Sequence, residues 1–344
     1  MQIKIRLGET KDKNYYSNKT NSPQLPSEKK NTPSASCLKN TADGAGKVGA
    51  VLEEINGMIG LAEVKSVIRE VQAFAEIQKK RASQQLLSES TVLHSVFKGN
   101  PGTGKTTMAR LLARLYKEMG VLQKGHLIEV ERADLVGEYI GHTAQKTKEQ
   151  VKKSLGGILF IDEAYSLARG GEKDFGREAI DVLVKAMEDY KNEFILILAG
   201  YRQEMNDFMN SNSGLESRFP LHIDFPDYSL DELLEITMLM YDKRQYITTH
   251  DASALLKKNL GYITTHYAGT HGNARTVRNL VESSLRMQAL RLVNSLSGTE
   301  PDISHAELQT INSFDIQKAF SKLKLPQINT SAPYYVDFVA NNQK

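Results

Sequence analysis

A chain of 344 residues has room for about two domains, and its content of 40% hydrophobic and 25% charged residues is that of a globular protein. Its 44 basic and 41 acidic side chains leave a net charge of +3, which is too small to indicate a nucleic-acid partner, and no apolar run reaches the ~18 residues that a membrane-spanning helix needs. The single cysteine, Cys37, excludes an intrachain disulfide and a cysteine-based metal cluster, which favours a reducing, cytoplasmic compartment.

The first fifty residues carry the basic excess. Residues 1–50 contain nine Lys or Arg and four Asp or Glu, a net of +5, so the rest of the chain nets −2. This segment is rich in Asn, Ser, Thr, Lys and Pro, and it shows almost no apolar periodicity. Such a composition cannot bury enough apolar surface to offset the entropy of ordering the chain. We therefore expect residues 1–50 to form a disordered, basic arm.

Between residues 51 and 226, patterns typical of helices and of strands alternate. A helical pattern of apolar residues comes first, over residues 51–85, and later helical patterns separate short apolar runs. This alternation predicts an α/β domain with a parallel sheet that helices cover on both faces. Five strands are expected, at residues 92–97, 126–130, 158–161, 194–199 and 221–225.

The pattern changes after Pro226. Ser229 and Glu232 have the spacing of a capping box, in which two side chains satisfy free N–H groups at the start of a helix. No further apolar run typical of a buried strand follows. We therefore predict that residues 227–323 form a small all-helical domain and that residues 324–344 form an irregular tail.

Residues 99–106 read G-N-P-G-T-G-K-T, which fits the phosphate-binding pattern G-x-x-x-x-G-K-[ST] between a predicted strand and a predicted helix. Glycines let backbone N–H groups wrap a phosphate, and the helix that follows offers its positive end. Lys105 is expected to reach the β- and γ-phosphates, and the Thr106 hydroxyl to ligate Mg²⁺. The expected nucleotide-binding residues are Gly99, Asn100, Pro101, Gly102, Thr103, Gly104, Lys105, Thr106 and Thr107.

Two adjacent carboxylates complete this prediction. The apolar run 158–161 would deliver Asp162 and Glu163 to the carboxyl end of a buried strand, beside the phosphates. Asp162 is expected to hold Mg²⁺ through water. Glu163 is expected to act as the base for a water molecule that attacks the γ-phosphate. The sequence therefore predicts an ATPase site with ATP and Mg²⁺ as its cofactors.

The paired carboxylates and the segments 59–65, 137–143 and 215–219 resemble the AAA+ ATPase family, and within it a group of sporulation proteins and red-type Rubisco activases. The resemblance covers about residues 50–323. It implies a phosphate-loop α/β core followed by a helical lid. It also implies a ring, usually a hexamer, with ATP between neighbouring subunits. Ile59 and Gly60 would then pack against the adenine.

The resemblance further implies roles for three segments. Arg218 matches an arginine finger that reaches into the next subunit's site. Arg275 matches a lid arginine that contacts the γ-phosphate, with Arg278 as the alternative. The segment 139–141 matches a loop that lines a central pore and grips polypeptide, and its residues are Tyr139, Ile140 and Gly141.

One position departs from the family pattern. Many members end the fourth strand with Asn or Thr, which orients the attacking water, whereas this chain has Ala199-Gly200-Tyr201. The Tyr201 hydroxyl could take over this role, or the role could be absent, so the water-orienting residue stays open.

The leading expectation is a homo-oligomeric ATPase motor that remodels a protein client, without nucleic-acid binding or membrane insertion, in a bacterial cytoplasm. The added arm and the lack of any Calvin-cycle feature favour a sporulation-associated client. The alternatives are a metabolite-regulated activase of a metabolic enzyme and a nucleotide-gated switch or scaffold. An ATPase acting on nucleic acid is disfavoured, because the folded part nets −2 and the pore loop is aromatic rather than basic.

Overall fold

The computed structural model describes residues 36–88, 92–139, 141–169, 174–211, 213–267, 269, 272–295 and 303–323. The chain divides into two units, residues 1–42 and residues 43–344, and nearly all described residues belong to the second. The predicted tail at 324–344 lies outside the described residues.

Helix α1 (Ser36–Asn56) corrects the prediction that the chain is disordered up to residue 50. Val51 and Ile55 are buried, and Val48 and Leu52 pack against the same cluster. These four residues recur at helical spacing, and their burial offsets the entropy of ordering the helix. The apolar pattern therefore begins a few residues before the predicted boundary. Residues 1–35 of the predicted arm lie outside the described residues.

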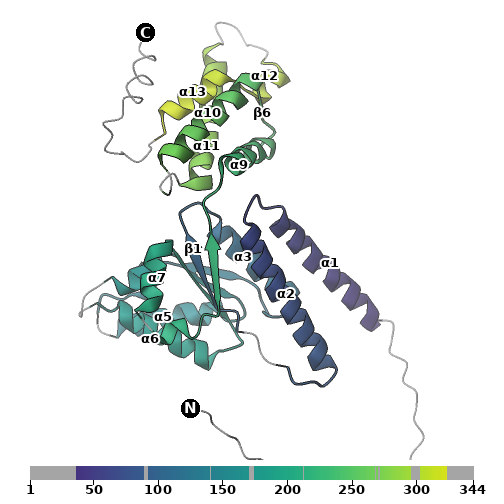
Figure 1. Cartoon of the computed structure of the whole chain (residues 1–344), viewed down its shortest axis with the longest axis vertical. Helices are drawn as coiled ribbons and strands as arrows, with labels where there is room; N and C mark the ends of the chain where they lie inside the picture. Colours follow the sequence, from purple (N-terminus) through teal and green to yellow (C-terminus); the bar gives the residue numbers. More distant parts are fainter. Residues whose placement is uncertain are drawn as a thin grey trace, which may run out of the picture. The chain divides into compact units, whose positions relative to one another are not determined.

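A five-stranded parallel sheet forms the α/β part, which confirms the predicted fold class (Figure 1). The strand order is β2-β3-β4-β1-β5, so the first strand in sequence lies between the last two. In this register Phe97 of β1 pairs with Ala199 of β4 and with Ile223 of β5. The strands are β1 (Ser95–Gly99), β2 (Leu127–Val130), β3 (Ile158–Ile161), β4 (Ile195–Gly200) and β5 (Leu221–Phe225).

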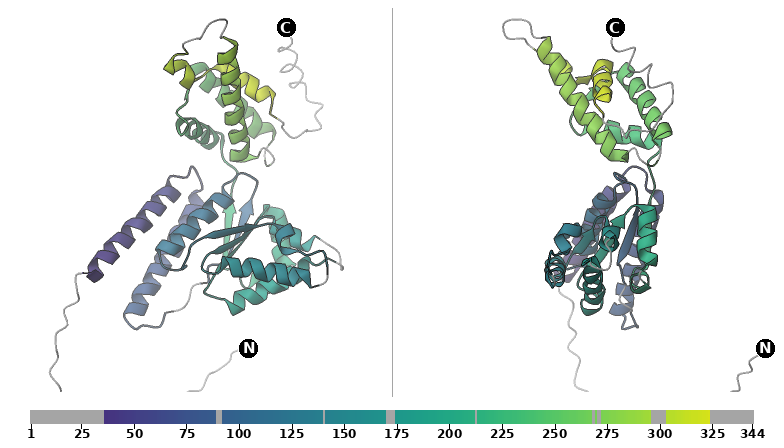
Figure 2. Two further views of the ribbon diagram at one scale, coloured as in Figure 1. Left: turned by 180° about the vertical axis from the view of Figure 1, so that it is seen from behind. Right: turned by 90° about the vertical axis from the view of Figure 1, so that its left-hand side faces the viewer.

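Helices cover both faces of this sheet, as Figure 2 shows from two further sides. Successive strand residues alternate between two hydrophobic clusters: Ile158 and Phe160 face one, and Leu159 and Ile161 face the other. The first cluster includes α2 (Ala62–Ser83) and α3 (Lys105–Glu118). The second includes α5 (His142–Ser154), α6 (Gly176–Asp189) and α7 (Arg202–Asn210). The short elements on this side are α4 (Arg132–Leu135), η1 (Ala164–Ala168) and α8 (Ser213–Glu216).

The lid is helical, as predicted, and begins with the predicted capping box. The Ser229 hydroxyl accepts from Glu232 N, and the Glu232 carboxylate accepts from Ser229 N at 2.7 Å. Strands β6 (Ile247–Thr248) and β7 (Thr310–Ile311) form a parallel pair that the apolar pattern did not reveal, since two residues are too few for a period. The lid helices are α9 (Leu230–Asp242), α10 (His250–His266), α11 (Asn273–Asn294), α12 (His305–Gln309) and α13 (Ser313–Ser321).

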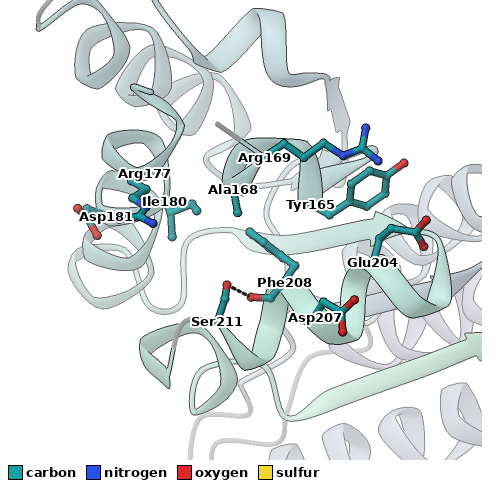
Figure 3. A pocket seen from close by; sticks show the side chains of 10 residues that line it. All are labelled: Tyr165, Ala168, Arg169, Arg177, Ile180, Asp181, Glu204, Asp207, Phe208 and Ser211. Carbon is teal, nitrogen blue, oxygen red and sulfur yellow. Dashed lines mark hydrogen bonds between the residues drawn. The ribbon is translucent and has the colours of Figure 1, made fainter. Parts of the chain in front are cut away.

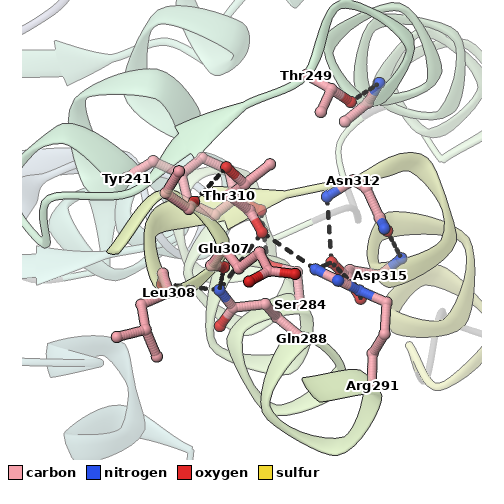
Figure 4. Close-up of polar contacts among 12 residues, drawn as sticks. Tyr241, Thr249, Ser284, Gln288, Arg291, Glu307, Leu308, Thr310, Asn312 and Asp315 are labelled. Atoms are coloured by element: carbon pink, nitrogen blue, oxygen red, sulfur yellow. Dashed lines mark hydrogen bonds and ion pairs between the residues drawn. The ribbon is translucent and has the colours of Figure 1, made fainter. Parts of the chain in front are cut away.

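A buried ion pair stabilises the lid (Figure 4). Arg291 Nη2 lies 2.9 Å from Asp315 Oδ2, and its Nε donates to Oδ1 at 3.0 Å. The Asp315 side chain is fully buried, and the guanidinium pairs with its carboxylate in a bidentate geometry. The same arginine donates to Thr310 O at 3.1 Å, which ties α11 to the β7 strand. No helix in the described part of the chain combines the length and the apolar character needed to cross a bilayer.

A buried histidine precedes β1. His94 is 3% exposed, and its Nδ1 accepts a hydrogen bond from Leu196 N at 3.0 Å. Its ring lies 5.8 Å from the ring of Phe194 and 6.1 Å from that of Phe219. Burial lowers the pKa of His94 from an ordinary value of 6.5 to about 4. The imidazole is therefore neutral in the folded protein at pH values where it is charged in the unfolded chain.

This difference predicts an acid-sensitive stability. As the pH falls from 6.5 towards 4, the unfolded chain takes up a proton at His94 that the folded protein does not, which costs about 2–3 kcal/mol of unfolding free energy in total. His94→Asn keeps an acceptor for the Leu196 N–H but does not titrate, so urea unfolding should show a flatter loss of stability between pH 7 and pH 5. His250→Asn, at a side chain 99% exposed, is the control. Equal slopes for His94→Asn and the unsubstituted protein would contradict this account.

Candidate functional site

The phosphate-binding loop runs from the end of β1 to the start of α3. Gly102 and Gly104 have φ values of 75° and 97°, which side-chain-bearing residues rarely adopt. The Lys105 ammonium donates to Gly99 O at 2.8 Å and to Asn100 O at 2.9 Å. The Thr103 hydroxyl also donates to Asn100 O, at 2.8 Å. The predicted loop therefore forms one closed turn ahead of a helix N-terminus.

Charged residues from three other segments surround Lys105. Burial lowers the pKa of the Lys105 ammonium, and the positive charge of Arg275 lowers it further. The negative charges of Asp162, Asp227 and Glu163 raise it. The fold therefore gathers the predicted carboxylates and the predicted lid arginine around the phosphate loop, and it adds Asp227, which sequence reasoning missed.

The two predicted carboxylates follow β3 directly, but they differ in their surroundings. Asp162 N donates to Val130 O at 3.1 Å, which continues the pairing with β2, and Asp162 is half-buried. Glu163 has a φ of 47°, and it is exposed. Its N–H donates to Asp162 Oδ1 at 3.0 Å. Glu163 thus adopts the left-handed backbone conformation directly after the buried strand, and such strain in a non-glycine residue is common at functional sites.

A second set of residues borders the phosphate loop near Ile59 and Gly60, the pair predicted to pack against the adenine. Gly60 and Leu61 have φ values of 65° and 57°. A Cβ at Gly104 would lie 3.3–3.6 Å from Tyr228 Oη, Met58 Cε and Leu61 Cδ1, and the Tyr228 hydroxyl donates to Thr103 O at 3.2 Å. Leu61 belongs to the segment 59–65 that the resemblance places against the adenine, whereas Met58 and Tyr228 were not predicted.

Arg218 lies after α8, and its partners belong to its own chain. Its Nη1 donates to Gly214 O at 2.8 Å, and its Nη2 forms an ion pair with Glu188 of α6. Neither partner is part of the phosphate site. The structure therefore does not bring Arg218 to the nucleotide site of the same chain.

The segment predicted as a pore loop stands between α4 and α5. The Tyr139 side chain is 66% exposed, and its ring meets that of His142 edge-on, with 5.4 Å between the ring centroids. Gly141 has a φ of 81° and caps α5, and a Cβ there would meet no atom within 4 Å. Ile140 lies outside the described residues. Tyr139 is thus an aromatic side chain presented to the surface rather than packed into the core.

Tyr201 follows β4 and belongs to a small aromatic group. Its ring centroid lies 5.9 Å from that of Tyr165, and the Arg169 guanidinium stands 4.4 Å from the centre of the Tyr165 ring. Burial raises the pKa of Tyr165 to about 12, and the nearby charge of Glu163 adds to this rise. Tyr165 therefore lies near both the Tyr201 ring and the charge of Glu163.

The α6 and α7 side holds a hollow of about 580 Å³ (Figure 3). No residue of the phosphate loop lines it, so we do not assign it to the nucleotide. Its lining carries both signs of charge, with Arg169 and Arg177 beside Asp181, Glu204 and Asp207. The other lining residues are Tyr165, Ala168, Ile180, Phe208 and Ser211.

Comparisons with known proteins agree with this arrangement. The family model for the ATPase family associated with various cellular activities (AAA) matches residues 95–227, and the AAA lid domain matches residues 229–325. The chain is 54% identical over 283 residues to stage V sporulation protein K of Bacillus subtilis (strain 168), which covers 82% of this chain and 86% of that protein. It is 44% identical over 270 residues to protein CbbX of Cereibacter sphaeroides, which covers 77% of this chain and 86% of that protein.

Solved structures share the fold at low sequence identity. The FIGL-1 AAA domain in complex with ADP has a TM-score of 0.53 and 15% identity, over 83% of this chain and 89% of that one. A mutant of Thermotoga maritima RuvB has a TM-score of 0.51 and 20% identity, over 78% of this chain and 71% of that one.

Proposed function

Because the chain belongs to the AAA+ ATPase family and hydrolyses ATP, we propose that it works as a ring-forming motor that remodels a protein client. Its 54% identity to stage V sporulation protein K, against 44% to CbbX, favours a client that acts during spore formation over the activase alternative. The lone cysteine and the Bacillus relative favour the cytoplasm of a bacterium as its location. We propose a hexameric ring, as the family resemblance implies.

The nucleotide chemistry follows from the residues around Lys105. Water attacks the γ-phosphorus, the bond from that phosphorus to the β–γ bridging oxygen breaks, and Glu163 takes the proton from the water. Lys105 and Arg275 offset the negative charge of the phosphates. Thr106 and Asp162 would hold Mg²⁺, the latter through water, and this ion supplies further positive charge at the phosphates.

One observation carries the client-gripping part of the proposal: Tyr139 is 66% exposed on a short loop that ends at Gly141. A flat, apolar ring on the surface can hold polypeptide by apolar contact without reading a particular sequence. We propose that Tyr139, with Ile140 and Gly141, contacts the client in the central pore.

A trapping experiment tests this proposal. Glu163→Gln should bind ATP without hydrolysing it, so the client should stay attached and co-purify. Adding Tyr139→Ala to this variant should release the client. Adding Phe314→Ala, which removes another aromatic side chain, 49% exposed in the lid, should not. Retention of the same protein by both double variants would contradict the assignment of Tyr139.

A further inference from the structure

Three polar side chains join the phosphate-binding loop to the lid. Asn100 lies in the loop, Asp227 follows β5, and Asn273 begins α11. The Asn100 amide donates to both carboxylate oxygens of Asp227, at 2.9 Å each. The Asn273 amide donates to Asp227 Oδ1 at 2.7 Å. One carboxylate thus accepts from two amides that stand 173 positions apart in the chain.

The Asn273 side chain is buried and hydrogen-bonded through both its nitrogen and its oxygen. It is 1% exposed, and its side-chain nitrogen also contacts Pro101 O in the loop, at 3.3 Å. Its side-chain oxygen accepts from Tyr228 N at 2.9 Å, and its backbone has a φ of 47°. A buried amide with both its nitrogen and its oxygen hydrogen-bonded fixes one orientation of the groups around it.

The backbones of the loop and the lid also meet at this point. Ala274 N donates to Gly102 O at 3.2 Å. A Cβ at Gly102 would lie 2.3 Å from Gly272 O and 2.9 Å from Arg275 N, so only glycine allows this approach. These contacts lie directly beside Arg275, which is two positions after Asn273 in the chain. They therefore fix where Arg275 lies relative to Lys105.

We propose that Asp227 and Asn273 are positioning residues for ATP hydrolysis, and that this carboxylate–amide pair holds the phosphate loop and the lid in the geometry in which Lys105 and Arg275 face the same phosphates. The inference rests on the role proposed above for Arg275. The chemistry requires a carboxylate, because every partner of Asp227 in this network is an N–H donor. An amide there would turn one of its own donors towards another donor.

Three variants test the pair: Asp227→Ala, Asn273→Gly and their combination. Glycine removes the Asn273 amide while still accepting the positive φ. Hydrogen bonds to a charged group are strong, so each single variant should lose about tenfold or more in affinity for a fluorescent ADP analogue and should show a lower kcat. The double variant should bind the ADP analogue no more weakly than the single variant with the lower affinity, because either change breaks the same connection. Asp231→Asn, at an exposed carboxylate in the first turn of α9, is the matched control.

The readouts separate positioning from folding and from the role of Arg275. If the melting temperature shows that Asp227→Ala does not fold, Asp227→Asn replaces it in the test. Asparagine keeps the side-chain volume and one acceptor oxygen, so its loss of ADP affinity should be smaller but still measurable. ADP affinity within twofold of the unsubstituted protein, or losses that simply add in the combination, would overturn the inference. A normal kcat in Arg275→Ala beside impaired binding in Asp227→Ala would instead remove Arg275 from the mechanism and leave the loop-to-lid connection standing.

Discussion

Replacing Glu163 by Gln should lower the rate of ATP hydrolysis by about 10²–10⁴-fold, the usual contribution of a general base, while nucleotide binding persists. Glu163 directly follows β3, its negative charge acts on Lys105, and the residue is exposed, so solvent water can reach its carboxylate. Glutamine keeps the shape but cannot accept the proton. Phosphate release under saturating ATP measures the rate, and binding of a labelled ATP analogue measures retention.

Two matched variants make this result specific. Glu204→Gln removes another carboxylate whose charge also acts on Tyr165, but Glu204 lines the hollow beside α7 and should leave turnover near normal. Asp162→Asn should lower the rate and raise the Mg²⁺ concentration that half-maximal hydrolysis requires, because it removes a carboxylate proposed to hold the ion. If Glu163→Gln hydrolysed ATP within about tenfold of the unsubstituted protein, another group would have to serve as the base.

The parts of this site that depend on neighbours in the sequence could be predicted. The phosphate loop is a contiguous pattern, and the buried strand before Asp162 and Glu163 is a contiguous apolar run. The strand order could not be predicted, because β1 pairs with β4 and β5 through contacts that no local pattern specifies. Both ends of the first strand also differ from the prediction, which was 92–97, whereas β1 spans Ser95–Gly99. Its pairing with β5 begins only at Ser95 and continues to Gly99.

The connection between loop and lid was missed for the same reason. Asn100 was predicted only as part of the phosphate loop, and Asp227 and Asn273 are ordinary polar residues in sequence. The connection among the three comes from hydrogen bonds between segments more than 40 positions apart. A weak signal existed: Asn273 stands two residues before the predicted lid arginine, and Asp227 directly follows the expected domain boundary. Neither position has a chemical requirement until the fold brings the amides to the carboxylate.

Arg218→Ala should produce the other large effect, a fall in turnover of about 10³–10⁵-fold, because an arginine supplied by a neighbouring subunit stabilises the charge on the transferred phosphoryl group. In the isolated chain Arg218 pairs with Glu188 and Gly214, away from the phosphate loop, as expected for a residue that acts on another subunit's nucleotide. The affinity of the Arg218→Ala variant for nucleotide should change little. Arg218→Lys should recover only part of the rate, since lysine lacks the planar fork.

Mixing two inactive variants distinguishes a neighbour's arginine from one acting within its own chain. Arg218→Ala keeps an intact nucleotide site without the arginine, and Glu163→Gln keeps the arginine beside a site that cannot hydrolyse. In a mixed ring, Arg218→Ala subunits would receive Arg218 from Glu163→Gln neighbours, so activity should reappear although neither variant has it alone. Glu188→Gln, which frees Arg218 from its ion pair, should leave turnover equal or higher. An inactive mixture under conditions where both variants assemble would show that Arg218 acts within its own chain or only supports the fold.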